Sequence, residues 1–239
     1  MCCYNYLKKI TTMTMTDLID VYMFDYISTS QCVGLNQCGC CSMVEEMNAI
    51  RSAYIAGNRP IEDIIRSCVC NRHGHQYCIS GAAVDEAVKR LVVSEVILSD
   101  LHRKPFIEHG KFVKGFCDFE ELYDFVRSVI GEITGIGPLT IYDTAKRIGH
   151  LLQPAIYPKQ YVYLAAGAMD GAKKLLGAKS LEFREPTHLF TPYFGTLSSI
   201  FIEDMLCIFK DYFILGGVNP VNSTPSKVYG KANASVTTI

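Results

Sequence analysis

The stretch Ile133-Thr134-Gly135-Ile136-Gly137-Pro138-Leu139-Thr140-Ile141 decides the fold expected of this 239-residue chain. Its two glycines mark a tight turn between two segments with helical patterns. After the turn, apolar residues recur at steps of four, three and four and so share one helix face: Ile141, Ala145, Ile148 and Leu152. Before the turn, a second apolar stripe follows the capping residue Asp118: Leu122, Phe125, Val126 and Val129. We therefore predict two helices joined by the glycine turn.

Helical patterns also dominate the rest of the chain. They predict a helix that begins near Ser42 and stops at Gly57, and further helical segments after Pro60, over residues 82–98 and over 197–212. Residues 161–164 are the one short extended piece expected. The predicted protein is mainly α-helical. Three regions are expected: an irregular Cys-rich extension (1–41), a single helical domain (42–215) with the hairpin at 132–152, and a flexible tail (216–239).

Composition limits the class of protein. The chain is 49% hydrophobic and 20% charged, which excludes disorder along its whole length. Its apolar runs are too short for a spanning helix, and its start has no signal-peptide pattern, so we expect an intracellular, soluble protein of the cytoplasm or nucleus without a membrane partner. The 11 cysteines are then expected as free thiols.

The glycine turn has the form of an anion-binding element. Glycines let another backbone approach, and the first N–H groups of the following helix lack intrahelical partners. Residues 139–184 contain seven Lys or Arg against three Asp or Glu, a net charge of +4. We predict that main-chain atoms of the turn bind a phosphate and that nearby lysines and arginines neutralise its neighbours. The predicted phosphate-binding residues are Gly135, Gly137, Leu139, Thr140, Lys146, Arg147 and Lys173.

Gly135-Ile136-Gly137 between two short helices resembles the helix-hairpin-helix element of DNA repair glycosylases, polymerases and ligases, over about 20 residues. The resemblance implies non-sequence-specific binding to the DNA backbone, in repair or processing. The position of the family's nucleophilic lysine falls on Leu139, so the resemblance does not imply lyase chemistry. Blocks between residues 70 and 211 resemble a group of uncharacterised bacterial and phage proteins, which implies a continuous helical domain and no particular activity.

Two other classes of function stay open at this point. An enzyme acting on nucleic acid or a nucleotide, glycosylase-like or a hydrolase, would use His73, His75 and Asp170. A protein-interaction module would use the hairpin only to turn the chain. Five residues of the types that bind zinc lie within 11 positions: Cys68, Cys70, His73, His75 and Cys78. Their separations in the sequence are shorter than those of the usual zinc-binding patterns. We therefore predict no metal and no cofactor, and the sequence does not decide whether the protein is an enzyme.

Overall fold

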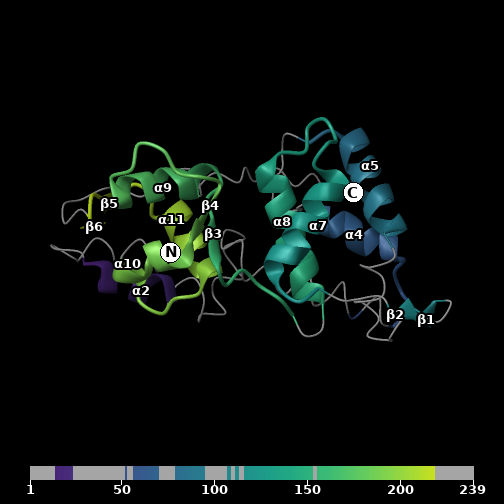
Figure 1. Ribbon diagram of the computed structural model, residues 1–239, viewed down its shortest axis with the longest axis horizontal. Coiled ribbons are helices and arrows are strands. Elements are labelled where there is room, and N and C mark those ends of the chain that lie inside the picture. The colour runs from purple at the N-terminus through teal and green to yellow at the C-terminus, as the bar shows by residue number, and fades with distance from the viewer. Residues whose placement is uncertain are drawn as a thin grey trace, which may run out of the picture. The chain divides into compact units, whose positions relative to one another are not determined.

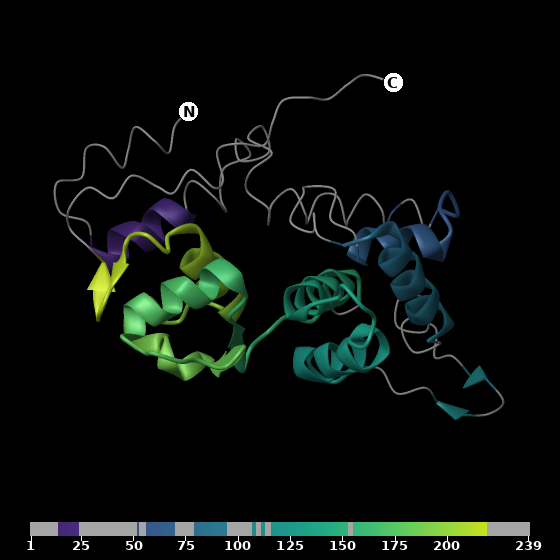
Figure 2. The ribbon, with the colours of Figure 1, turned by 90° about the horizontal axis from the view of Figure 1, so that it is seen from above.

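The structure is a computed structural model of the full chain, and it describes residues 14–23, 52, 56–69, 79–94, 107–108, 111–112, 116–152 and 155–218. These residues are mainly helical, with strands of only two or three residues. They form two compact units (Figures 1 and 2). Unit 1 comprises residues 1–42 and 162–239, and unit 2 comprises residues 43–161. None of the described helices has the length and apolar character needed to cross a bilayer.

The described part of unit 2 contains four bounded helices and one two-stranded sheet. Their bounds are α4 (Ile61–Val69), α5 (Gly81–Val93), β1 (Ile107–Glu108), β2 (Lys111–Phe112), α7 (Phe119–Ile130) and α8 (Pro138–Leu151). Helix α4 packs on α5 and α8, and α7 packs on α5 and α8, so the apolar stripes of the four helices meet in one core. At the surface, an ion pair of 2.7 Å between Arg66 and Asp85 joins α4 to α5.

The described residues of unit 1 combine helices with two small two-stranded sheets. Its elements are α2 (Met15–Val21), β3 (Tyr161–Tyr163, at the boundary), α9 (Ala166–Leu176), β4 (Arg184–Pro186), the 3-10 helix η3 (Thr187–Leu189), α10 (Thr191–Phe194), α11 (Ser199–Ile208), β5 (Phe213–Ile214) and β6 (Gly217–Val218). Strand β3 pairs with β4, and β5 pairs antiparallel with β6. Helices α9 and α11 lie side by side in the centre of the unit.

The core of unit 1 draws together segments far apart in the sequence. Helix α2 is closed at its start by a capping box in which Thr14 and Asp17 bond to each other's backbone N–H. Its buried Leu18 and Tyr22 pack into the core, and the Tyr22 hydroxyl donates to Asp204 of α11 at 3.0 Å. Burial of these two side chains holds a helix of only seven residues, which would not persist alone.

The mainly helical character predicted from the sequence is confirmed, as are a helix after Pro60 and a helix capped by Asp118. The division into units differs from the single domain predicted over 42–215, because residues 162–218 build their own core with α2. Helix α2 lies in the extension predicted to be irregular, and β6 lies in the predicted flexible tail. The remaining tail residues, 219–239, and the helix predicted to begin near Ser42 lie outside the described residues, apart from Ser52 and Ala56.

Candidate nucleic-acid interface

Helix α7 is the first arm of the hairpin, and its sequence sets both of its ends. The Asp118 carboxylate accepts from the N–H of Glu121 at 2.8 Å, and the Glu121 carboxylate accepts from the N–H of Cys117 at 2.7 Å. The helix ends at Gly131, whose N–H bonds to the carbonyl of Arg127 at 2.8 Å. The apolar face between these ends is buried: Phe119, Leu122, Tyr123, Val126 and Ile130.

The turn between α7 and α8 is held by its own backbone and by one buried side chain. The N–H of Ile133 bonds to the carbonyl of Ile130 at 3.1 Å, and the N–H of Ile136 bonds to the carbonyl of Ile133 at 2.9 Å. The Ile136 side chain is buried and anchors the turn. Gly135 has a φ of +93°, a conformation that other residues adopt only with strain. The turn therefore requires glycine at this position.

Helix α8 begins with backbone N–H groups that no described side chain caps. Its N-cap is Gly137, which has no side chain, and its first residue is Pro138, which has no N–H. The first intrahelical bond runs from the N–H of Ile141 to the carbonyl of Gly137, at 3.1 Å. The N–H groups of Leu139 and Thr140 precede it, at the positive end of the helix dipole.

The turn is also open in front of its glycines. A Cβ added at Gly135 or at Gly137 would meet no atom within 4 Å among the described residues. Gly135 and Pro138 are exposed, whereas Gly137 and Leu139 are half-buried. The Thr140 side chain is buried, so of the predicted main-chain ligands it is the most enclosed. The described residues therefore leave the space over Gly135 and Gly137 open.

The two basic residues predicted to assist the turn have partners inside unit 2. Arg147 is only 3% exposed, and its guanidinium donates to the carbonyl of Cys68, in the last turn of α4, at 2.8 Å. Its second nitrogen lies 3.8 Å from the Asp143 carboxylate. Lys146 lies 3.4 Å from the same carboxylate and 5.0 Å from the centre of the Tyr142 ring. The spacing from Asp143 to these residues, three and four positions along a helix, is the sequence signal for this neutralisation.

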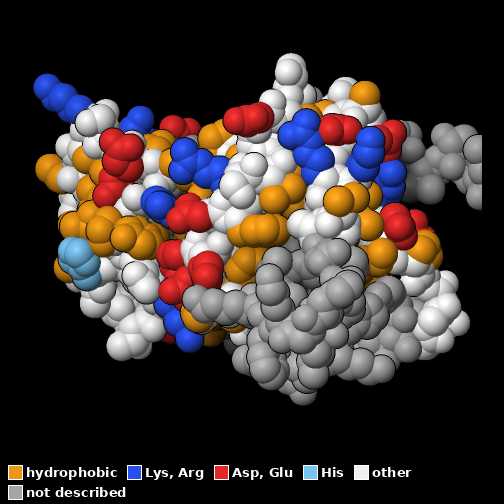
Figure 3. Space-filling model, turned by 45° about the vertical axis from the view of Figure 1, so that its right-hand side comes forward, with side chains coloured by type: hydrophobic (Ala, Val, Ile, Leu, Met, Phe, Trp, Pro, Cys, Tyr) orange, Lys and Arg blue, Asp and Glu red, His pale blue; other side chains and the backbone are white. Residues whose placement is uncertain are grey.

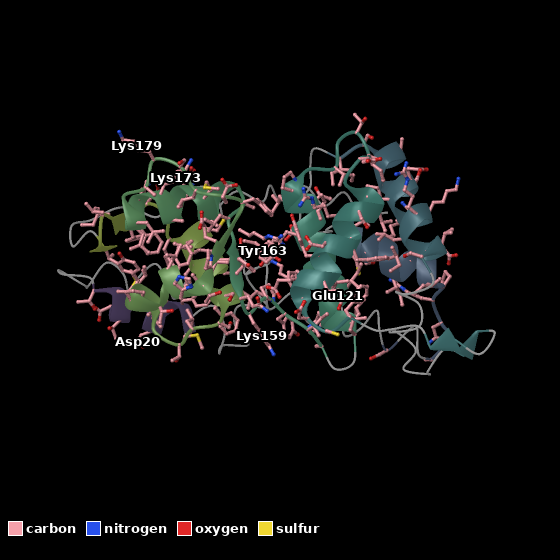
Figure 4. All side chains as sticks on the ribbon, in the orientation of Figure 1. Asp20, Glu121, Lys159, Tyr163, Lys173 and Lys179 are labelled. Carbon is pink, nitrogen blue, oxygen red and sulfur yellow. The ribbon has the colours of Figure 1, made fainter. Side chains whose placement is uncertain are left out.

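The prediction that Arg147 contacts DNA phosphate is therefore corrected: the side chain is enclosed and joins α8 to α4. Lys146 is 12% exposed and already faces a carboxylate, so it brings little charge to the turn. Lys173 lies on α9, which belongs to unit 1, whereas the hairpin belongs to unit 2 (Figure 4).

One exposed basic residue beside the turn was not predicted. Arg127 lies in the last turn of α7, and its Cγ is 3.6 Å from the place a Cβ would occupy at Gly131. Its side chain has no ion pair or hydrogen bond with any part of the chain that the structure describes. In the sequence, the position of Arg127 four residues before Gly131, which ends the helix, is the feature that could have indicated it. Glu132, which follows in the turn, is also exposed and carries the opposite charge.

Of the three residues of the predicted enzyme, the structure describes only Asp170. His73 and His75 lie outside the described residues, with Cys70 and Cys78, while Cys68 is buried in α4. Asp170 lies on α9, and its carboxylate is 3.9 Å from the ammonium of Lys210. The glycines beside it, Gly167 and Gly171, give room to α11 rather than to a ligand.

On the face shown in Figure 3, Lys and Arg side chains are interspersed with Asp and Glu side chains. This agrees with the net charge of −1 for the whole chain. Comparison with protein-family models, curated proteins and solved structures finds no match to this chain.

Proposed function

We propose that the turn of residues 134–140 binds a phosphate of the DNA backbone, without reading base sequence. The observation that carries the proposal is the start of α8, where Gly137 caps the helix without a side chain and leaves the following N–H groups to an outside acceptor. Phosphate oxygens fit that place because they accept several hydrogen bonds and carry the charge that the helix dipole favours. Contacts to phosphate position a protein on DNA and carry no base information.

The charges around the turn predict weak, mildly salt-sensitive binding. Arg127 supplies one exposed positive charge, while Lys146 and Arg147 face Asp143 and Arg147 also bonds to α4. Each phosphate neutralised by a cation contributes about −0.9 to the slope of log affinity against log salt. The hairpin is therefore expected to give a slope of about −1 to −2, smaller than if Lys146 and Arg147 also took part.

Substitution Gly137→Asp tests the proposal, because a carboxylate at this position caps α8 and occupies the place of the phosphate. Asp is a good N-cap, so the free energy of unfolding should stay within a few tenths of a kcal/mol of wild type or rise slightly. Affinity for a fluorescein-labelled 20-base-pair duplex, measured by anisotropy, should fall about tenfold or more, since a repelled charge replaces a hydrogen-bonded one.

The matched control is Gly81→Asp. Gly81 is the first residue of α5 in the same unit, and a Cβ there would meet nothing within 4 Å. This variant adds the same charge away from the turn and should keep most of the affinity. A duplex bound equally well by Gly137→Asp and wild type would refute the proposed function, and the hairpin would then be a turn of the chain without a phosphate ligand.

A further inference from the structure

The chain that follows α8 folds back over the last turns of that helix. We call residues 155–160 the strap; they belong to unit 2. The N–H of Ile156 donates to the carbonyl of Gly149 at 3.0 Å. A Cβ added at Gly149 would lie 2.5 Å from the carbonyl oxygen of Ile156 and 3.3 Å from a methyl group of Leu122. The strap can therefore dock only because α8 has a glycine at this position.

A second contact fixes the middle of the strap. The hydroxyl of Tyr157 and Nδ1 of His150, in the last turn of α8, lie 2.6 Å apart in a hydrogen bond. Burial raises the pKa of Tyr157, so the phenol keeps its proton, and it donates to Nδ1 wherever this nitrogen carries no proton of its own. An imidazolium would instead donate to the phenol oxygen, so the contact exists in both charge states of His150. Pro158, the next residue, is buried.

The end of the strap lies beside the start of α7. Burial raises the pKa of Glu120, and the backbone N–H groups of Gln160 and Lys159 offset part of this rise. Neither carboxylate oxygen of Glu120 reaches hydrogen-bonding geometry with a described partner, so this contact is the weakest of the three. Ala155, Lys159 and Gln160 are exposed. Of the six residues of the strap only Pro158 is buried, which places the strap among the segments that open before the core does.

We propose that the strap is a releasable element that controls the length of the connection between the two units. Docked, it holds the chain on unit 2 as far as Gln160, so the connection to unit 1 begins there. Released, it frees the chain between Leu152 and Tyr161, nine residue steps that extend over about 30 Å at most. Release thus changes how far unit 1 can move from the unit that carries the hairpin, whatever ligand the hairpin binds.

Limited trypsin digestion of the full chain tests this proposal, because Lys159 is exposed within the strap and Lys179 is exposed in unit 1 (Figure 4). Two variants weaken the docking by different means. Tyr157→Phe removes the hydroxyl that contacts His150, and Gly149→Ala adds the Cβ that collides with Ile156. Alanine favours a helix over glycine, so the second variant does not weaken α8 by propensity.

The initial rate of cleavage after Lys159, measured by mass spectrometry, should rise about two- to tenfold in both variants, as loss of one hydrogen bond predicts. Cleavage after Lys179 serves as the internal control and should stay the same. A faster cleavage after Lys159 alone, in either variant, supports the proposal that the strap is releasable. An unchanged rate at Lys159 in both variants, or an equal rise at both lysines, overturns it. So does wild-type cleavage at Lys159 as fast as in a free peptide of residues 155–163.

Discussion

Each unit contains a pair of closely spaced glycines, and the two pairs have opposite surroundings in the structure. Gly167 and Gly171 lie one helical turn apart on α9, and α11 fills the space beside them. A Cβ at Gly167 would lie 2.8 Å from Sγ of Cys207, and one at Gly171 would collide with the carbonyl of Leu206. Gly135 and Gly137 have no such neighbour within 4 Å. A glycine that the protein's own atoms surround serves packing, and one that they leave open is available to a ligand.

The same contrast holds for positive charge. Arg147 is enclosed and donates to the carbonyl of Cys68, whereas Arg127 is exposed with no described partner. Both belong to the hairpin, yet only Arg127 can meet an outside phosphate without leaving a buried acceptor unpaired. The open glycines lie in the turn, and the exposed arginine lies in the last turn of α7, just before it in the chain. Among the described residues of unit 2, this hairpin is therefore our candidate for binding.

The largest effect is expected at the enclosed glycines. Gly171→Ala should lower the free energy of unfolding of unit 1 by about 2 kcal/mol, because the added methyl group forces α9 away from the backbone of α11. The loss should exceed the gain of about 1 kcal/mol that alanine brings to a helix. Hydrogen exchange of the α9 amides at increasing urea concentrations would measure this change in the free energy of unfolding. Gly81→Ala, at a site where a Cβ meets nothing within 4 Å, is the control and should not destabilise unit 2. Equal changes in stability in the two variants would contradict the account of Gly171 as a glycine required by packing.

A smaller effect is expected at the basic residues of the hairpin. Arg127→Gln should weaken duplex binding about three- to eightfold near 0.1 M salt and reduce the magnitude of the salt slope by about 0.9. Lys146→Gln should change both by much less, because the lysine already faces Asp143 at 3.4 Å. Anisotropy titrations at four salt concentrations would separate the two variants. The reverse order of effects would show that Lys146 leaves Asp143 for the phosphate.

The local features of the fold could be predicted from the sequence. Asp118 at the start of α7 and Gly131 at its end mark that helix, and Gly137-Pro138 marks the start of α8. Helix α2 could not be predicted, because its seven residues depend on burial of Leu18 and Tyr22 against segments more than 100 residues away. The two units follow from the same long-range packing, which no local pattern indicates.

For the candidate site too, only the local backbone features could be predicted from the sequence. The sequence shows where a turn with bare N–H groups should lie, since glycine and proline act through the backbone. It does not show where a long side chain ends. The position of Asp143 before Lys146 and Arg147 predicts an ion pair, but only the packing of α4 on α8 brings the carbonyl of Cys68 to Arg147. For the same reason, the role of Gly149 under the strap could not be read from its neighbours in the sequence.

The central claim is that the start of α8 binds phosphate through its backbone. Amide chemical shifts of the ¹⁵N-labelled protein, followed during titration with duplex DNA, test it most directly. We predict the largest shifts at the amides of Gly137, Leu139 and Thr140, with similar values for two duplexes of unrelated sequence. Unchanged shifts at these three amides while the duplex binds, or shifts confined to another part of the chain, would contradict the account.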